Sequence, residues 1–472
     1  MNTTTAAAEL AKRAPFVGPS EDDGSARARV TGTLPEWLRG TLVRTAPMFG
    51  ASLPWEPTHL FDAVALAYGI DVGGPEATLH WARIDSETAR AARTGRVPSA
   101  QFQTRNGRGF FQRLFGPIPK ATDNPNVNVV RMGNDVVALT ESPHQWRLDP
   151  VTLRACGRVE YHDSLGRSAI MLAHPIIGPD GVTNIAYRLG SRAEIMLYTH
   201  DAASRARKLV ATWSTPNLPY LHSFGLTERS AIVVAHPFTA KPASMLWSNA
   251  GFIEHFRWHP ERGTRLVVFD RTAGPAQTAR EYETDSLFVF HVAHAFETAD
   301  AAIVDVLAFD DPSIIASAMT RTLLARAPEL PAKLRRLTID RRTGQVRNEL
   351  LSDTPFELPQ VDAERAAGRA ATTVFGASVG LDRGVSTGDI VAIDPRSGSA
   401  RRFREAPWIF GEPVFVGKPG RAREGEGVLL AVGSHEHASA LFALDASTLD
   451  VLARAEFRTP LPFGFHGSFL PS

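Results

Sequence analysis

The feature that most constrains the fold is a short turn motif that recurs along the chain. In each copy an apolar residue precedes an Asp, and a Ser or Thr follows two or three residues after that Asp. The copies lie at Asp149, Asp270, Asp340, Asp394 and Asp445, with a degenerate copy at Asp201. An Asp in this setting predicts a strand that ends in an Asx-type turn, with the next strand starting after it. Successive copies are 51 to 70 residues apart.

This spacing predicts a β-propeller. A four-stranded blade takes roughly 40–50 residues, and the longer intervals can hold insertions, so we expect six or seven blades. Short β-branched runs bounded by turn residues fill much of the chain, including two strands predicted around a Gly-Asn turn in 126–141. The best helical candidates are 89–95 and 312–328. Ordinary hairpins in a sandwich or barrel are the alternative that the repeat leaves open.

The segment 241–260 is unusually rich in large apolar residues for a region between strands. It contains Met245, Leu246, Trp247, Phe252, Ile253, Phe256 and Trp258, with Lys241 and Arg257 at the flanks. A buried helix is one interpretation. The other is a shallow membrane-docking patch or the mouth of a tunnel, because aromatic residues beside cations suit an interface.

Composition excludes several classes of protein. The formal net charge is +1, which argues against a nucleic-acid binder that works by bulk electrostatics. A single cysteine, Cys156, excludes a disulfide framework and a thiolate metal site. The N-terminus lacks the apolar stretch of a secretory signal, and no segment approaches the roughly 20 apolar residues of a membrane span. We therefore expect a cytoplasmic protein.

Any metal site must use the 15 His and the carboxylates. His435 and His437 lie in a polar turn, and the aromatic context of His255 and His259 favours packing. Four other His lie in mostly apolar strings: His174, His222, His291 and His466. Their spacings of 48, 69 and 175 residues approximate one, one and three blade periods. In a propeller such positions converge on the central axis, and four neutral imidazoles with open coordination positions favour a redox metal such as Fe(II).

Three acids have a related character. Glu141, Glu357 and Glu412 each follow or adjoin an apolar strand, where an unpaired carboxylate is unfavourable. A metal-bound His needs an acceptor for its other ring N–H. The three Glu could supply that acceptor, although surface or turn positions are the alternative.

Together these strings resemble the carotenoid cleavage oxygenases, a family that includes apocarotenoid oxygenases, stilbene-cleaving dioxygenases and the retinoid isomerase of the eye. The similarity is collinear and runs from LRGTLVRTAPMFG (38–50) to FGFHGSF at the C-terminus. It implies one domain over 1–472, an all-β, seven-bladed β-propeller with a helical and loop cap over its top face. Residues 1–14 are expected to be flexible, and 241–260 and 312–328 to form the cap.

The resemblance also implies the site. Fe(II) on the axis would be bound by His174, His222, His291 and His466, and Glu141, Glu357 and Glu412 would orient three of them. No catalytic residue beyond the metal is implied. His294 falls where the family often has Asn, so it is not assigned as a ligand.

Three strings depart from the family pattern. Arg44–Pro47 reads Arg-Thr-Ala-Pro instead of Arg-Asn-Gly-Pro, and Phe61–Ala63 reads Phe-Asp-Ala instead of Phe-Asp-Gly. The lost glycines put a local turn in doubt rather than the iron site. Ser223 replaces an Asp that is common after the second ligand.

The reaction implied is oxidative cleavage of a conjugated C=C bond of a carotenoid or apocarotenoid by O2 into two carbonyl products. The expected partners are an apolar polyene and O2, without nucleic acid or an obligate protein partner. Peripheral membrane contact through 241–260 is a further hypothesis. One alternative is a stilbene-cleaving or phenylpropene-cleaving dioxygenase, whose cavity would pair Tyr and Lys with a phenol. The second is a non-oxygenase metal-binding propeller such as a lactonase.

Overall fold

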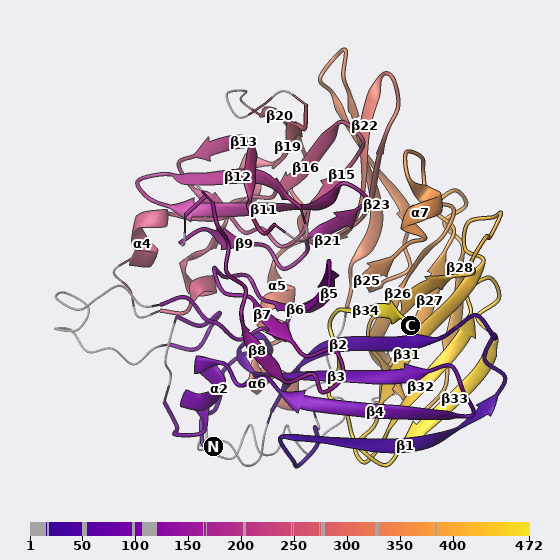
Figure 1. The fold of residues 1–472 in the computed structure, drawn as a ribbon. Helices are drawn as coiled ribbons and strands as arrows, with labels where there is room; N and C mark the ends of the chain where they lie inside the picture. Colours follow the sequence, from indigo (N-terminus) through magenta and orange to yellow (C-terminus); the bar gives the residue numbers. More distant parts are fainter. Residues whose placement is uncertain are drawn as a thin grey trace.

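The computed structural model describes residues 16, 18–49, 54–96, 100–105, 120–163, 165–166, 168–201, 204–246, 248, 250–272, 274, 279–325, 330–382 and 385–472. The predicted flexibility of 1–14 lies outside these residues. The named strands pair in antiparallel sheets, which follow one another in chain order around a common centre (Figure 1). The prediction of a fold built mainly of short strands is confirmed.

Six of the sheets in the described part of the chain are small. Four of them have four strands each. The first contains β5 (Asn128–Met132), β6 (Asp135–Leu139), β7 (Trp146–Leu148) and β8 (Ala155–Arg158), and the second contains β15 (Gly225–Leu226), β16 (Ser230–Ala235), β19 (Thr264–Asp270) and β20 (Arg280–Thr284). The third contains β21 (Phe288–Glu297), β22 (Ala301–Phe309), β23 (Lys333–Asp340) and β24 (Val346–Ser352), and the fourth contains β25 (Glu357–Gln360), β26 (Val374–Asp382), β27 (Val385–Ile393) and β28 (Ala400–Arg404). A fifth sheet contains β9 (Ile170–Met171), β10 (Ile176–Gly178), β11 (Gly181–Leu189), β12 (Ala193–His200) and β13 (Lys208–Thr215). A three-stranded sheet contains β14 (Leu218–Pro219), β17 (Phe238–Ala240) and β18 (Arg257–Trp258).

The remaining sheet joins the two ends of the chain. It contains β1 (Asp23–Gly32), β2 (Gly40–Met48), β3 (Val64–Val72), β4 (Glu76–Arg83), β29 (Ile409–Phe410), β30 (Val414–Gly417), β31 (Gly427–Ser434), β32 (Ser439–Asp445), β33 (Val451–Phe457) and β34 (Gly467–Pro471). Strand β1 pairs with β4 along its first part and with β33 at its end, so it links an N-terminal group of strands to a C-terminal group. Because these groups share one sheet, the predicted number of seven blades stays a prediction.

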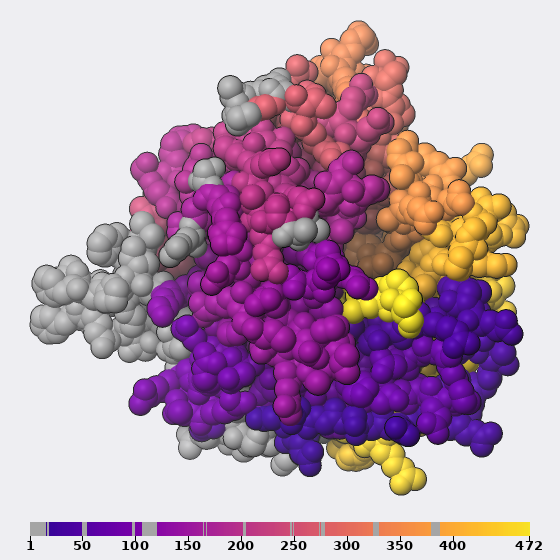
Figure 2. All heavy atoms as spheres, viewed as in Figure 1, coloured from indigo at the N-terminus to yellow at the C-terminus, as the bar shows by residue number. Residues whose placement is uncertain are grey.

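The C-terminal strand closes the ring. Strand β34 pairs with β2 from Gly40↔Pro471 to Arg44↔Gly467, although 420 or more residues of chain separate the two strands. Figure 2 shows this segment in yellow between the indigo N-terminal sheet and the orange sheets, beside a hollow in the surface. Closure in this register holds the residues just before Gly467 near the centre of the ring.

The turn repeat has the geometry that the sequence predicts. The Asp149 Oδ1 atom accepts hydrogen bonds from the backbone N–H groups of Val151 at 3.0 Å and Thr152 at 2.7 Å, and the other copies accept in the same way. These bonds lower the pKa of the Asp149 carboxyl. Every copy lies between the last two strands of its group, as Asp149 does between β7 and β8. The motif therefore marks one equivalent hairpin in successive sheets.

The helices in the described residues are short. They are η1 (Leu60–Asp62), α2 (Glu87–Ala92), α4 (Pro242–Leu246), η2 (Phe252–His255), η3 (Pro260–Arg262), α5 (Ser313–Ser317), α6 (Thr320–Ala325) and α7 (Ala363–Ala366). No helix among the described residues is long and apolar enough to cross a membrane. The helix predicted over 89–95 begins earlier, because the Ser86 side chain caps α2.

The two predicted cap segments differ from the sequence expectation. The helix predicted over 312–328 is divided into α5 and α6, because the backbone between them pairs with η1: Leu60 N donates to Ala318 O at 2.9 Å. The segment 241–260 is not one buried helix but α4, η2 and β18. Ile253 and Phe256 of this segment are buried in the main hydrophobic core. Trp247 lies outside the described residues.

The closure of the ring makes a prediction about Gly467. A Cβ atom there would lie 2.5 Å from Val43 O of β2, so Gly467→Ala should push β34 away from β2 and destabilise the protein by about 1–3 kcal/mol. Thermal unfolding of the full-length protein measures this effect. Gly74→Ala is the matched control, because nothing lies within 4 Å of a Cβ atom there. Equal melting temperatures for the two variants would contradict the proposed role of the closure.

Candidate metal centre

The four apolar-context His come together at the centre of the ring. His174 lies between β9 and β10, His222 between β14 and β15, His291 within β21 and His466 immediately before β34. One ring nitrogen of each lies within 4.8 Å of the corresponding atoms of the other three. The Nε2 atoms of His174 and His222 are 3.0 Å apart, and so are those of His291 and His466.

Three carboxylates, two of them buried and that of Glu141 partly buried, determine which nitrogen faces the centre. The Nδ1 atom of His222 lies 2.5 Å from Glu141 Oε1, that of His291 2.5 Å from Glu357 Oε2, and that of His466 2.9 Å from Glu412 Oε1. A carboxylate at this distance is an acceptor, so Nδ1 carries the proton and Nε2 presents its lone pair. Among the described residues, no carboxylate forms a hydrogen bond with His174 Nδ1.

The geometry fits a metal ion. Two neutral imidazoles whose Nε2 lone pairs face each other at 3.0 Å repel unless a cation lies between them. Neighbouring ligand nitrogens of one ion with bonds of about 2.1 Å are themselves about 3 Å apart. The four His therefore form a set of nitrogen ligands, and the three Glu supply the outer hydrogen bonds that such ligands need.

Burial keeps the imidazoles of His174 and His466 neutral. It lowers the pKa of His174 well below 6.5, and the neighbouring imidazoles add to the effect. Burial also lowers the pKa of His466 to about 4, although the Glu412 carboxylate partly opposes the shift. Only a neutral imidazole can bind a metal. The site is thus ready for a cation without releasing protons from these two residues near pH 7.

A buried arginine supports the fourth His. Arg44 of β2 is fully buried, and it donates to Glu412 O at 2.5 Å and Phe465 O at 3.0 Å. Its guanidinium also lies 3.8 Å from Glu412 Oε2. Burial alone would raise the pKa of the Glu412 carboxyl, but His466 and Arg44 outweigh it and hold that pKa below its usual range. Arg44 therefore connects the ring closure to the ligand His466.

Two other residues support the site, and neither was assigned a role from the sequence. The Ser223 hydroxyl donates to Phe290 O and accepts from Val292 N, each at 2.8 Å, so it holds the irregular part of β21 that carries His291. Gln360 Nε2 donates to Glu412 Oε1 at 2.9 Å. The departure at Ser223 was noted from the sequence, but only the fold reveals which strand the hydroxyl contacts.

The family departures near the N-terminus leave the turns intact. Ala63 has φ −60° and ψ 145°, an ordinary extended conformation, so alanine fits where the family often has glycine. Arg44–Pro47 lies within β2 rather than in a turn. Asp62 accepts from Phe102 N at 2.7 Å and Thr104 N at 2.7 Å, which ties η1 to the segment 100–105.

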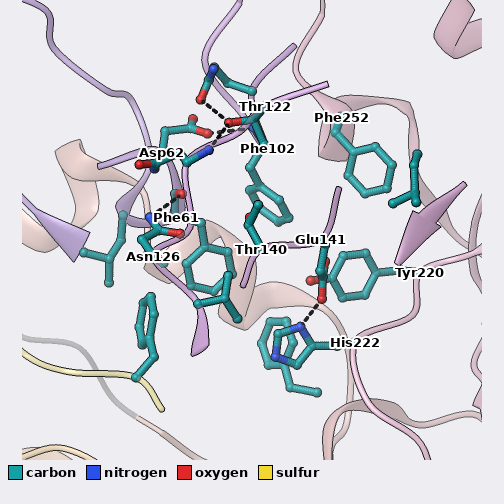
Figure 3. Close-up of a pocket in the computed structure, with 18 of the residues that line it drawn as sticks. Phe61, Asp62, Phe102, Thr122, Asn126, Thr140, Glu141, Tyr220, His222 and Phe252 are labelled. Atoms are coloured by element: carbon teal, nitrogen blue, oxygen red, sulfur yellow. Dashed lines mark hydrogen bonds and ion pairs between the residues drawn. The ribbon is translucent and has the colours of Figure 1, made fainter. Parts of the chain in front are cut away.

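A large apolar cavity adjoins the centre. Its volume is about 610 Å³. Its walls include Phe61, Phe102, Phe252, Phe290 and Phe465, and His222, His291 and His466 also line it. Figure 3 shows Glu141 on His222 with Tyr220 beside them, and Phe61 and Phe102 nearby. Residues of both predicted cap segments, such as Met245 and Ile314, line the same cavity.

Other sequence candidates lie elsewhere. His437 is exposed in the turn between β31 and β32, as expected. His294 Nε2 donates to Arg369 O at 2.8 Å, and His294 is not part of the four-His group. His259 also lies outside that group, whereas His255 lines the cavity.

Comparison with known proteins identifies the family. The model of the family described as retinal pigment epithelial membrane protein matches residues 18–471. The chain belongs to this family. It is 27% identical to a carotenoid isomerooxygenase of Galleria mellonella, over 94% of this chain and 93% of that protein. It is 25% identical to a β,β-carotene 15,15′-dioxygenase of Rattus norvegicus, over 94% of this chain and 89% of that protein.

Solved structures agree with the fold. The cobalt-substituted Synechocystis ACO, an apocarotenoid oxygenase, superposes with a TM-score of 0.84 at 22% identity, covering 98% of this chain and 99% of that one. The predicted all-β propeller class and the resemblance to carotenoid cleavage oxygenases are therefore confirmed. The names of the relatives also support the assignment of the chain as a dioxygenase.

The environment of Arg44 makes a prediction about the metal centre. Arg44→Met removes the cation beside Glu412 and leaves buried carbonyl groups without a donor. We expect the affinity for Co(II), followed by visible absorption, to fall about 10-fold to 100-fold, with partial recovery in Arg44→Lys.

Arg207→Met is the matched control. Arg207 is also a buried arginine paired with a carboxylate, that of Asp163, but it lies outside the four-His group. It should lower stability and leave Co(II) affinity unchanged. Equal losses of Co(II) affinity in both variants would mean that Arg44 acts only through general stability.

Proposed function

We propose that the protein is a non-heme Fe(II) dioxygenase that cleaves a conjugated C=C bond of a carotenoid or apocarotenoid. One O2 molecule is consumed, the C=C bond is broken, and each carbon becomes the carbon of a carbonyl group. The observation that carries the proposal is the convergence of four His beside a large apolar cavity, which three of them line. The names of the relatives, several of which are carotenoid-cleaving enzymes, support the same substrate class.

The ligands in this proposal are His174, His222, His291 and His466. A bound ferrous ion would supply the binding and activation of O2. Glu141, Glu357 and Glu412 would hold the proton on the outer nitrogen of three ligands and so keep their lone pairs on the metal. The apolar walls would position the polyene and exclude water. No acid or base beyond these groups is required, because the overall reaction moves no proton to or from the substrate.

The stilbene-cleaving alternative receives less support. It requires a lysine beside a tyrosine to pair with a phenol, and the described residues that line the cavity include neither Lys nor Arg. The lactonase alternative receives less support as well, because the relatives reported above are named as oxygenases.

Cytoplasmic residence and peripheral membrane contact through 241–260 are part of the proposal. Lining of the cavity by Met245 and Phe252 supports a role at its mouth, whereas the buried Ile253 and Phe256 are not available to a lipid surface. Flotation of the full-length protein with phospholipid vesicles tests the membrane contact, and protein that stays with the soluble fraction would contradict it.

The central test combines metal content with product identity. The purified protein should contain about one equivalent of iron when reconstituted, and incubation with a panel of carotenoids and apocarotenoids in O2 should yield pairs of aldehydes or ketones by mass. His291→Ala should reduce cleavage by about 100-fold or more, because one ligand is lost together with its hydrogen bond to Glu357. His437→Ala, an exposed His, should leave cleavage unchanged. Full activity in His291→Ala, or activity without O2, would overturn the proposal.

A further inference from the structure

One carboxylate oxygen of Glu141 and three hydroxyl oxygens of cavity-lining residues lack a hydrogen-bond partner among the described residues. They are Tyr187 Oη, Tyr220 Oη, Thr140 Oγ1 and Glu141 Oε2. All four residues line the cavity. Tyr187 and Tyr220 are 4% and 1% exposed, so their side chains meet the cavity rather than the outer surface of the protein.

Tyrosines outside the cavity are different. Tyr161 donates to Gln145 Oε1 at 2.5 Å, and Tyr198 Oη lies 3.3 Å from Asn184 Nδ2. Tyr198 is buried, Tyr161 is partly buried against the same hydrophobic cluster, and both have protein partners. The unpartnered phenols are therefore a feature of the cavity wall, where a ligand can complete their hydrogen bonds.

Three of the residues lie in one neighbourhood. The carboxylate of Glu141 and the two phenols are close enough to interact electrostatically with one another. Figure 3 shows the Tyr220 ring beside Glu141, with Thr140 nearby in the view. Glu141 uses only Oε1 to hold His222, so Oε2 is available as an acceptor. Phenols supply donors, and the carboxylate supplies an acceptor.

The charges of the residues that line the cavity limit the class of ligand that can bind there. Glu141, Glu357 and Asp62 line the cavity, and none of the described lining residues is Lys or Arg. In the metal-free protein a ligand carboxylate would enter without a cation and beside these acids, which is unfavourable. A neutral hydroxyl group can instead donate to Glu141 Oε2 and accept from a tyrosine.

We propose that Tyr187 and Tyr220, together with Glu141 Oε2 and Thr140 Oγ1, form a subsite that binds a hydroxyl group of the substrate beside the metal centre. This inference deepens the proposed function and rests on it for the polyene part of the ligand. It specifies the substrate as a hydroxylated polyene rather than a pure hydrocarbon.

The test compares ligands that differ in one functional group. The probes are an all-trans polyene alcohol, the hydrocarbon with CH3 in place of CH2OH, and the matching carboxylic acid. Binding to the metal-free, full-length protein is measured by quenching of tryptophan fluorescence. We expect the alcohol to bind about tenfold more tightly than the hydrocarbon, and the acid to bind most weakly. The double variant Tyr187→Phe/Tyr220→Phe should abolish the preference for the alcohol and leave the hydrocarbon affinity unchanged.

Tyr198→Phe is the matched control, since its phenol lies outside the cavity wall, and it should keep the preference. If the double variant does not fold, Thr140→Val and the two single variants replace it, each with a partial loss of preference. Equal affinity of the alcohol and the hydrocarbon in the unmodified protein, or equal weakening of both in the variants, would overturn the subsite.

This binding experiment can be interpreted separately from the proposed function because it requires neither metal nor turnover. A preference for the alcohol in a protein that cleaves no polyene when loaded with iron would support the subsite and overturn the dioxygenase proposal. A hydroxystilbene that binds through the same tyrosines, with polyenes that do not bind, would support the hydroxyl subsite and overturn the carotenoid substrate.

Discussion

The pairing of β34 with β2 is the interaction on which the rest of the structure depends. A ring of sheets must bring two distant parts of the chain into one register, and here Arg44 lies opposite Gly467. That register sets the position of His466, which immediately precedes the strand. It also brings the buried guanidinium of Arg44 to Glu412 and to the backbone that leads into the ligand. Closure of the fold and completion of the metal centre are therefore one event.

The centre is also an electrostatic arrangement that the interior must balance. Buried carboxylates are unfavourable unless they are hydrogen-bonded and paired, and each of the three Glu accepts from an imidazole N–H. The supports are unequal. Glu412 has a buried cation beside it, Glu141 directs a free oxygen into the cavity, and His174 has no carboxylate partner among the described contacts. The ligand set thus has its buried cation at the ring closure and the free carboxylate oxygen of Glu141 on the side of the cavity.

The signals that single out these His and Glu in the sequence are local. An Asp turn needs only the residues around it, so the repeat at Asp149 and its equivalents predicted hairpins that the structure contains. An imidazole in an apolar string is likewise visible in one strand. The helix predicted over 312–328 was wrong in its continuity, because a backbone pairing with η1 interrupts it. Ile253 and Phe256 are buried because a partner surface covers them, and no local pattern reveals that surface.

The sequence by itself determined the strand and turn periodicity, the absence of thiolate chemistry, and which four His and three Glu have apolar neighbours. These properties depend on residue type and short spacing. The tertiary structure alone decided that Arg44 supports Glu412, that Ser223 holds the strand of His291, and that Tyr187 and Tyr220 line the same cavity as Glu141. Those contacts join residues tens to hundreds of positions apart, and their geometry exists only after the ring has closed.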